Sequence, residues 1–232
     1  MRYYAILMTR LSIVATPIGN LEDITLRALR ILKEADIVAC EDTRVTKKLL
    51  SHFDIHVPTV SFHANSGQSG FDKIIKLLEE GKNVALVSDA GTPGVSDPGL
   101  ELVSQVREKL PDIKIETIPG ASSLTAALAV AGLRVPSFVF YGFLPQKKGR
   151  ETLFKEIAGS ERASIFLESP HRIMKALESL NKACPERRIG LFRELTKMFE
   201  EHLIGTPAEL LIKMEQDPNH QRGEFVVIVE GE

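Results

Sequence analysis

Apolar runs and segments of helical periodicity alternate along the first half of the chain. Phe71, Ile74, Ile75 and Leu78 follow the i, i+3, i+4, i+7 spacing of an amphipathic helix. Other helices are predicted from about residues 25, 43 and 100. The alternation predicts a mostly parallel sheet flanked by helices. Its strands are predicted at residues 11–15, 37–40, 57–61, 84–87 and 113–118.

A break at Arg134-Val135-Pro136 precedes a second series of elements. Strands are expected at 188–192 and 198–204 with no helix between them, which indicates a mixed sheet. The chain is therefore predicted to form two α/β domains, residues 1–134 and 135–232, with a ligand cleft between them. The other elements of the second domain are strands at 138–141, 163–167 and 225–229 and helices at 151–159, 171–182 and 207–215.

The composition is that of a globular protein. Of 232 residues, 44% are hydrophobic and 26% are charged. No apolar run approaches the roughly 18 residues of a membrane span, and the start is too interrupted for a secretory signal. Met8 is an alternative initiator to Met1. Cys40 and Cys184 lack partners at metal-ligand spacing. His52 and His56 are four residues apart, but Pro58 and the loop around them argue against a shared helical face. We therefore expect a cytoplasmic protein without membrane association or metal.

Four loops follow predicted strands, the position where open α/β sheets bind small ligands. The most informative loop is Ser88–Gly99, which contains three glycines, two prolines and two aspartates. Glycine lets a ligand approach the backbone closely, and proline stiffens the turn. The other loops are 15–21, 118–123 and 167–172. A phosphate-binding P-loop and a Gly-x-Gly-x-x-Gly dinucleotide motif are both absent from the sequence.

Eight motifs occur in order along the chain. They are Thr16–Asp23, Glu41–Arg44, Ser88–Gly99, Pro119–Ser122, Gly142–Pro145, Glu168–Arg172, Arg193–Lys197 and Gly223–Val226. In these motifs the chain resembles the tetrapyrrole-methylase (class III) superfamily of S-adenosylmethionine-dependent methyltransferases, and within it the members that methylate small-subunit ribosomal RNA. The resemblance spans residues 11–231. The chain departs from the family pattern in ending at Glu232, where many members continue, and in lacking an acidic residue in Phe62-His63-Ala64-Asn65.

The resemblance implies that S-adenosylmethionine is the cofactor and is held in the interdomain cleft, largely by backbone groups. Asp89 is the candidate for contacting its ammonium or ribose hydroxyls, and Gly120–Ser123 offer N–H groups at a helix start. The implied cofactor-binding residues are Pro17, Gly19, Asp89, Gly91, Pro93, Gly94, Ser122, Ser123, Phe166, Leu167, Leu195, Thr196, Glu224 and Phe225.

The implied reaction is methyl transfer to a ribose 2′-hydroxyl of a cytidine in 16S ribosomal RNA, free or in the small ribosomal subunit. A side chain must accept the hydroxyl proton. Glu41, Asp42, Glu168, His171 and Glu194 are available, and Glu168 and His171 are favoured because Ser-Pro between them forms a rigid corner.

The net charge of −2 requires that RNA be bound through local charge. The resemblance also implies a homodimer. A methylase of a tetrapyrrole-like small molecule and a non-catalytic RNA-binding relative remain alternatives. The candidate RNA-binding residues are Arg44, Lys47, Lys48, Lys147, Lys148, Arg150 and Arg172.

Overall fold

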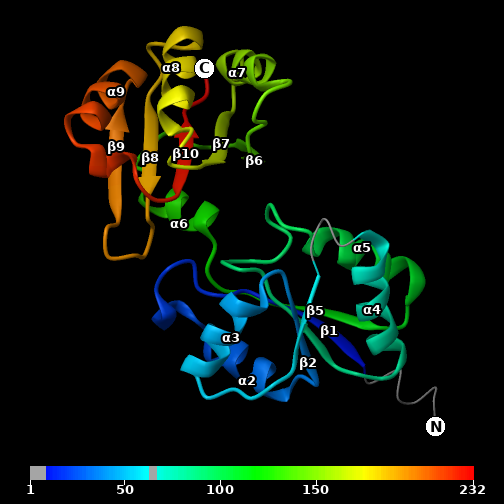
Figure 1. The fold of residues 1–232 in the computed structure, drawn as a ribbon. Helices are drawn as coiled ribbons and strands as arrows, with labels where there is room; N and C mark the ends of the chain where they lie inside the picture. Colours follow the sequence, from blue (N-terminus) through cyan, green and yellow to red (C-terminus); the bar gives the residue numbers. More distant parts are fainter. Residues whose placement is uncertain (1–8, 63–66) are drawn as a thin grey trace. The chain divides into compact units, whose positions relative to one another are not determined.

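The computed structural model describes residues 9–62 and 67–232. The alternative start positions Met1 and Met8 and the Ala64–Asn65 departure lie outside the described residues. The chain divides into two compact units, Met1–Ser122 and Ser123–Glu232 (Figure 1). The division falls earlier than the expected one after residue 134, because helix α6 (Ser123–Val130) contacts strand β10 (Phe225–Val229) of the second unit.

Within its described residues, the first unit contains a five-stranded sheet in the order β3-β2-β4-β1-β5. Every pairing in this order is parallel, as the alternating pattern predicts. The carboxyl ends of parallel strands meet at one edge of a sheet, so the loops after β1, β4 and β5 are neighbours. The strands are β1 (Arg10–Val14), β2 (Ile37–Cys40), β3 (Thr59–Ser61), β4 (Val84–Leu86) and β5 (Lys114–Ile118).

Helices pack against both faces of this sheet. One core cluster joins the strands to α4 and α5 through Ile74 and Leu102, and another joins them to α2 and α3 through Leu32 and Leu50. Successive strand side chains point to opposite faces, so a strand covered on both sides is apolar throughout. The helices are α2 (Leu26–Glu34), α3 (Thr43–His52), α4 (Gly67–Glu79) and α5 (Gly99–Lys109), with a 3-10 turn, η1 (Leu21–Asp23).

The second unit contains a five-stranded sheet in the order β6-β7-β10-β8-β9 within the described part of the chain. The β6–β7 pairing is parallel and the other three are antiparallel, which confirms the predicted mixed sheet. In addition to α6 and β10, the elements are β6 (Phe138–Phe143), α7 (Arg150–Ala158), β7 (Ala163–Glu168), α8 (Ile173–Ala183), β8 (Ile189–Arg193), β9 (Glu201–Gly205), α9 (Pro207–Gln216) and η3 (Pro218–Gln221).

The strand expected at 198–204 begins only at Glu201. Met198 and Phe199 belong to the turn after β8 and are 90% and 67% exposed. Glu194 and Thr196 have left-handed backbone conformations, with φ of 50° and 66°. The turn is fixed by hydrogen bonds from the Thr196 N–H to Glu200 Oε2 and from the Glu194 N–H to the Glu224 carbonyl.

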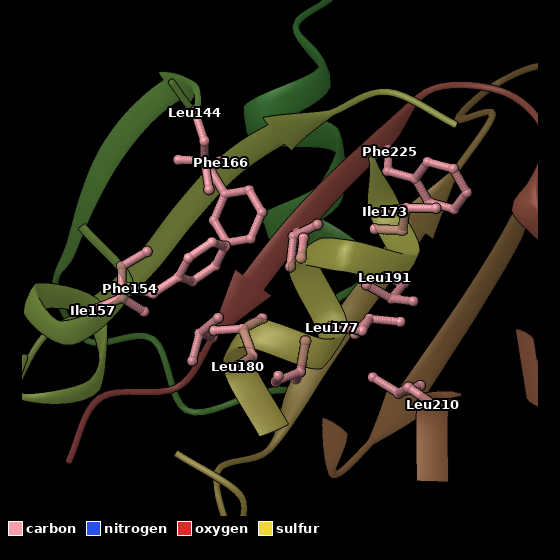
Figure 2. Packing of buried hydrophobic residues seen from close by; sticks show 14 of the residues in the cluster. Leu144, Phe154, Ile157, Phe166, Ile173, Leu177, Leu180, Leu191, Leu210 and Phe225 are labelled. Carbon is pink, nitrogen blue, oxygen red and sulfur yellow. The ribbon is translucent and has the colours of Figure 1, made fainter. Parts of the chain in front are cut away.

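The core of the second unit lies between its sheet and helices α7, α8 and α9 (Figure 2). The rings of Phe154 and Phe166 meet edge to face with centroids 6.4 Å apart. Phe225 and Leu144 are also buried in this cluster. The core therefore anchors the end of β7, the start of β10 and the chain just after β6.

Candidate functional site

Three loops are joined at the carboxyl edge of the first sheet. The Thr16 N–H donates to the Gly91 carbonyl at 2.9 Å, and the Gly91 N–H donates to the Thr16 carbonyl at 3.1 Å. Thr92 Oγ1 donates to the Ala121 carbonyl at 3.1 Å. The loops after β1, β4 and β5, which sequence analysis placed at one edge, thus form one connected backbone surface. Pro17 is buried beside this connection, and Gly19 is exposed.

Glycines allow these loops to approach one another. Gly91 has φ of +81°, and a Cβ there would lie 3.1 Å from Ile18 Cγ2. A Cβ on Gly120 would lie 3.0 Å from the Cβ of Ala15. A side chain at Gly91 would be strained by conformation and by space, so we attribute this glycine to loop closure.

The second half of the Ser88–Gly99 loop is organised by Asp97. Its carboxylate accepts hydrogen bonds from the Gly94 N–H at 2.8 Å and from the Gly99 N–H at 2.7 Å. Gly94 has φ of +89°, and Pro93 is buried. Asp97 therefore holds the turn that leads into α5, a role that sequence analysis did not assign to it.

Carboxylates from two neighbouring strands meet at the same edge. Asp89 follows β4, and its Oδ1 accepts the Asp42 N–H at 3.0 Å, although the Asp89 side chain remains exposed. Glu41 follows β2. Partial burial, together with the negative charges of Asp97 and Asp89, raises the pKa of Glu41 to about 7. Desolvation and like charge both disfavour the ionised carboxylate.

Asp42 behaves in the opposite way. The Arg44 guanidinium and backbone N–H lower the pKa of Asp42 to about 2. Asp42 caps α3 by accepting the Arg44 N–H, so it is an ionised structural group. Two adjacent acidic residues thus have opposite protonation tendencies, and Glu41 is the one suited to exchanging a proton near neutral pH.

The loop after β5 leads into α6, whose first residue is Ser123. The first N–H groups of a helix have no acceptor within the helix, and they favour a bound carboxylate or hydroxyl. Ser122 and Ser123 are both half-buried at this position.

The predicted cofactor-binding residues of the second unit come together at one edge of its sheet. Phe225 on β10 pairs with Glu168 on β7 and with Arg193 on β8. The side chains of Phe166 and Phe225 are buried in the core, so these residues would offer a ligand only their backbone groups. The remaining members of this group are Leu167, Leu195, Thr196 and Glu224.

Glu168 has no exposed side-chain surface. Its carboxylate accepts hydrogen bonds from Arg150 Nη2 at 2.9 Å and from the Ser169 N–H at 2.8 Å, and it pairs with Arg172 Nε at 2.7 Å. A carboxylate bound to two guanidinium groups and a backbone amide is poorly placed to accept a proton from substrate. His171 is exposed.

The predicted RNA-binding residues divide into two kinds. Lys47, Lys48, Lys147 and Lys148 are exposed, as is Arg44, which also pairs with Asp42. Arg150 and Arg172 have only 13% and 21% of their side chains exposed, because they pair with Glu168. A surface hollow of about 430 Å³ adjoins the first group; it is lined by Lys47, Leu50, Ser51, Ile55, His56, Val57 and Pro58.

Comparison with known proteins assigns the family. The model of the Tetrapyrrole (Corrin/Porphyrin) Methylases matches residues 10–211. The chain belongs to this family. The ribosomal RNA small subunit methyltransferase I of Halalkalibacterium halodurans is 48% identical over 95% of this chain and 75% of its own length. The protein of the same description from Thermotoga maritima is 41% identical over 97% of this chain and 99% of its own.

Solved structures agree on the fold. Uroporphyrin-III C-methyltransferase from Thermus thermophilus, crystallised with S-adenosyl homocysteine, matches 95% of this chain and 97% of its own with a TM-score of 0.65 and 20% identity. As a member of the tetrapyrrole methylase family, the chain is a methyltransferase. Its loops offer groups that suit S-adenosylmethionine, which are an exposed carboxylate at Asp89 and N–H groups at the start of α6.

Within residues 9–62 and 67–232, no helix is long and apolar enough to cross a membrane. No group of three His, Cys, Asp or Glu side chains in the same ranges could hold a metal ion.

Proposed function

We propose that this methyltransferase methylates the ribose 2′-hydroxyl of a cytidine in 16S ribosomal RNA of the small ribosomal subunit. The observation that carries the proposal is the backbone surface formed by the loops at Thr16, Gly91 and Ala121. The same loops hold the motifs that resemble RNA-methylating members of the family. The relatives named ribosomal RNA small subunit methyltransferase I support the RNA substrate.

S-adenosylmethionine supplies a methyl group activated by the neighbouring sulfonium. The chain has to hold the cofactor and align the acceptor oxygen with that methyl. We assign the methionine ammonium or the ribose hydroxyls to Asp89, and the methionine carboxylate or a hydroxyl to the N–H groups from Gly120 to Ser123. Pro17, Gly19, Gly91, Pro93 and Gly94 would pack their backbone against the cofactor.

We assign the proton acceptor to Glu41. As the 2′-oxygen bonds to the methyl carbon, the carbon–sulfur bond breaks and the hydroxyl proton must leave. A carboxylate whose pKa is about 7 is ionised in part of the molecules at neutral pH and holds a proton well enough to receive it. His171 is the second candidate because it is exposed and its ring can accept a proton.

RNA would be bound by exposed cations of both units, Lys47 and Lys48 on α3 and Lys147 and Lys148 before α7. Contacts of this kind recognise phosphates and make affinity sensitive to salt. The family resemblance further supports a cytoplasmic homodimer, which size-exclusion chromatography with light scattering would test.

The decisive experiment uses small ribosomal subunits from a bacterial strain lacking the gene for this chain. The purified chain and S-adenosylmethionine are added, and 2′-O-methylation is mapped by resistance to alkaline cleavage. A new methyl group at one cytidine is the expected result. Methylation of a tetrapyrrole instead, or RNA binding without any methylation, would replace the proposal with one of its alternatives.

A further inference from the structure

Two consecutive carbonyl groups in the second unit are bound by arginine side chains. Arg172 Nη1 donates to the Leu144 carbonyl at 3.0 Å, and Arg150 Nη1 donates to the Pro145 carbonyl at 3.2 Å. The same two guanidinium groups bind the carboxylate of Glu168, at 2.7 Å and 2.9 Å. One buried carboxylate thus organises two arginines, which in turn hold the backbone after β6.

The backbone at Leu144 and Pro145, which the arginines bind, leads directly into a short basic loop. Residues 146–149 read Gln-Lys-Lys-Gly and are exposed. The loop closes with a hydrogen bond from the Arg150 N–H to the Lys147 carbonyl at 3.3 Å, and Gly149 adopts φ of +85° before α7 begins. Its two ends are therefore fixed, one by the arginine contacts at Pro145 and the other by the start of the helix.

The buried cluster of Glu168, Arg150 and Arg172 is energetically unfavourable if its only role is to stabilise the fold. Charges taken out of water lose hydration, and well-packed apolar residues often replace a buried ion pair at no loss. The cluster also has two positive charges and one negative charge, so it adds a positive charge beneath a loop that already carries two. An anionic ligand would be favoured at such a surface. Arg150 also lies over the Phe154 ring, 5.2 Å from its centroid, which fixes the guanidinium further.

We propose that Glu168 is a positioning residue, which acts through Arg150 and Arg172 to hold the loop of Lys147 and Lys148 in the shape that binds RNA phosphates. This inference rests on the proposed function and assigns its RNA contact. It gives Glu168 a role different from the proton acceptor expected from sequence. The arginines would act on RNA mainly through the loop and not by direct contact.

The test replaces Arg150 by another cation, so that its contacts with the Pro145 carbonyl and Glu168 change while its positive charge stays. In Arg150→Lys, a single ammonium cannot reproduce the planar fork that binds the Pro145 carbonyl and Glu168 together. We expect KM for small ribosomal subunits to rise roughly tenfold, with kcat within about twofold. The affinity for S-adenosylhomocysteine, measured by calorimetry, should not change. Arg172→Lys, which removes the contact with the Leu144 carbonyl, provides a second variant if the first does not fold.

A double-mutant cycle separates positioning from general stability. Lys147→Ala combined with Lys148→Ala should raise KM and reduce the steepness of its salt dependence, by about 1.4 in log KM per log salt for two contacts with single-stranded RNA. Adding Arg150→Lys to this pair should cause little further change, because the loop it positions no longer carries the lysines. Lys182→Ala with Lys213→Ala removes the same charge from exposed sites on α8 and α9 and is the matched control.

Independent, multiplying effects of Arg150→Lys and the lysine pair would overturn the inference, as would an unchanged KM in Arg150→Lys. Equilibrium binding of fluorescently labelled small subunits is measured alongside methyl transfer. If the wild-type chain binds subunits but transfers no methyl group, the proposed function fails while the binding cycle still tests the role of Glu168.

Discussion

Replacement of Glu41 by glutamine should make the protein more stable and less active at the same time. The unfolded chain releases the Glu41 proton near pH 4.5, whereas the folded chain keeps it up to about pH 7. The folded state therefore binds more protons between these values, and the wild type loses stability as pH rises through this window. Glutamine is always neutral and has no such loss.

The size of the effect follows from the environment of the carboxyl. A pKa raised from 4.5 to about 7 corresponds to an upper limit of about 3 kcal/mol. The Glu41 side chain is partly exposed, so solvent screening reduces the expected gain of Glu41→Gln to about 1–2 kcal/mol at pH 8. At pH 4.5 and below, the two proteins should have nearly equal free energies of unfolding.

The assay is urea unfolding of wild type and Glu41→Gln from pH 4.5 to pH 8.5, followed by circular dichroism. Glu79→Gln makes the same chemical change on an exposed face of α4 and is the matched control. Asp89→Asn removes one of the charges that raise the Glu41 pKa, so it should reduce the pH-dependent difference. Methyl transfer by Glu41→Gln should fall about a hundredfold if Glu41 accepts the proton.

Two results would refute this reasoning separately. A difference in unfolding free energy that stays constant with pH would show that Glu41 is not held in an acidic, partly buried environment. An unchanged rate with a normal pH-dependent stability gain would leave the electrostatics intact and move the proton acceptor to His171 or another group.

The remaining predictions concern the cofactor loops and one helix. Gly91→Ala should destabilise the protein by about 1–2 kcal/mol, because alanine is strained in the left-handed region and its Cβ would lie 3.1 Å from Ile18 Cγ2; thermal unfolding measures this, and unchanged stability would contradict it. Asp89→Asn removes the negative charge assigned to the cofactor, so calorimetry should show S-adenosylhomocysteine binding weakened about tenfold; the asparagine oxygen can still accept the Asp42 N–H, so unfolding at pH 4.5, where folded Glu41 is protonated, should change little. Thr206→Ala breaks the capping box of α9 and should cost about 1 kcal/mol in urea unfolding without changing cofactor affinity.

Local patterns predicted most elements of the fold. The structure has β2 at Ile37–Cys40 and α3 at Thr43–His52, as expected, because strand and helix periodicities are visible within a few residues. The segment expected to be a strand from Met198 begins as a turn, and β9 starts only at Glu201. Its apolar side chains resemble a strand, but Glu194 and Thr196 adopt left-handed conformations and form a turn that ordinary preferences for these residue types do not indicate.

Sequence alone determined the family, the parallel order of elements in the first half and the loops that would meet at the carboxyl edge. These features depend on motifs and periodicities that lie close together in the chain. Tertiary structure decided the chemistry of the acidic residues. Glu41 lies near Asp89 because β2 and β4 are neighbours in the sheet, and Glu168 is held in an ion pair because Arg150 reaches it from the start of α7. Burial and nearby charge set the behaviour of a carboxyl group, and both are created only when distant segments pack together.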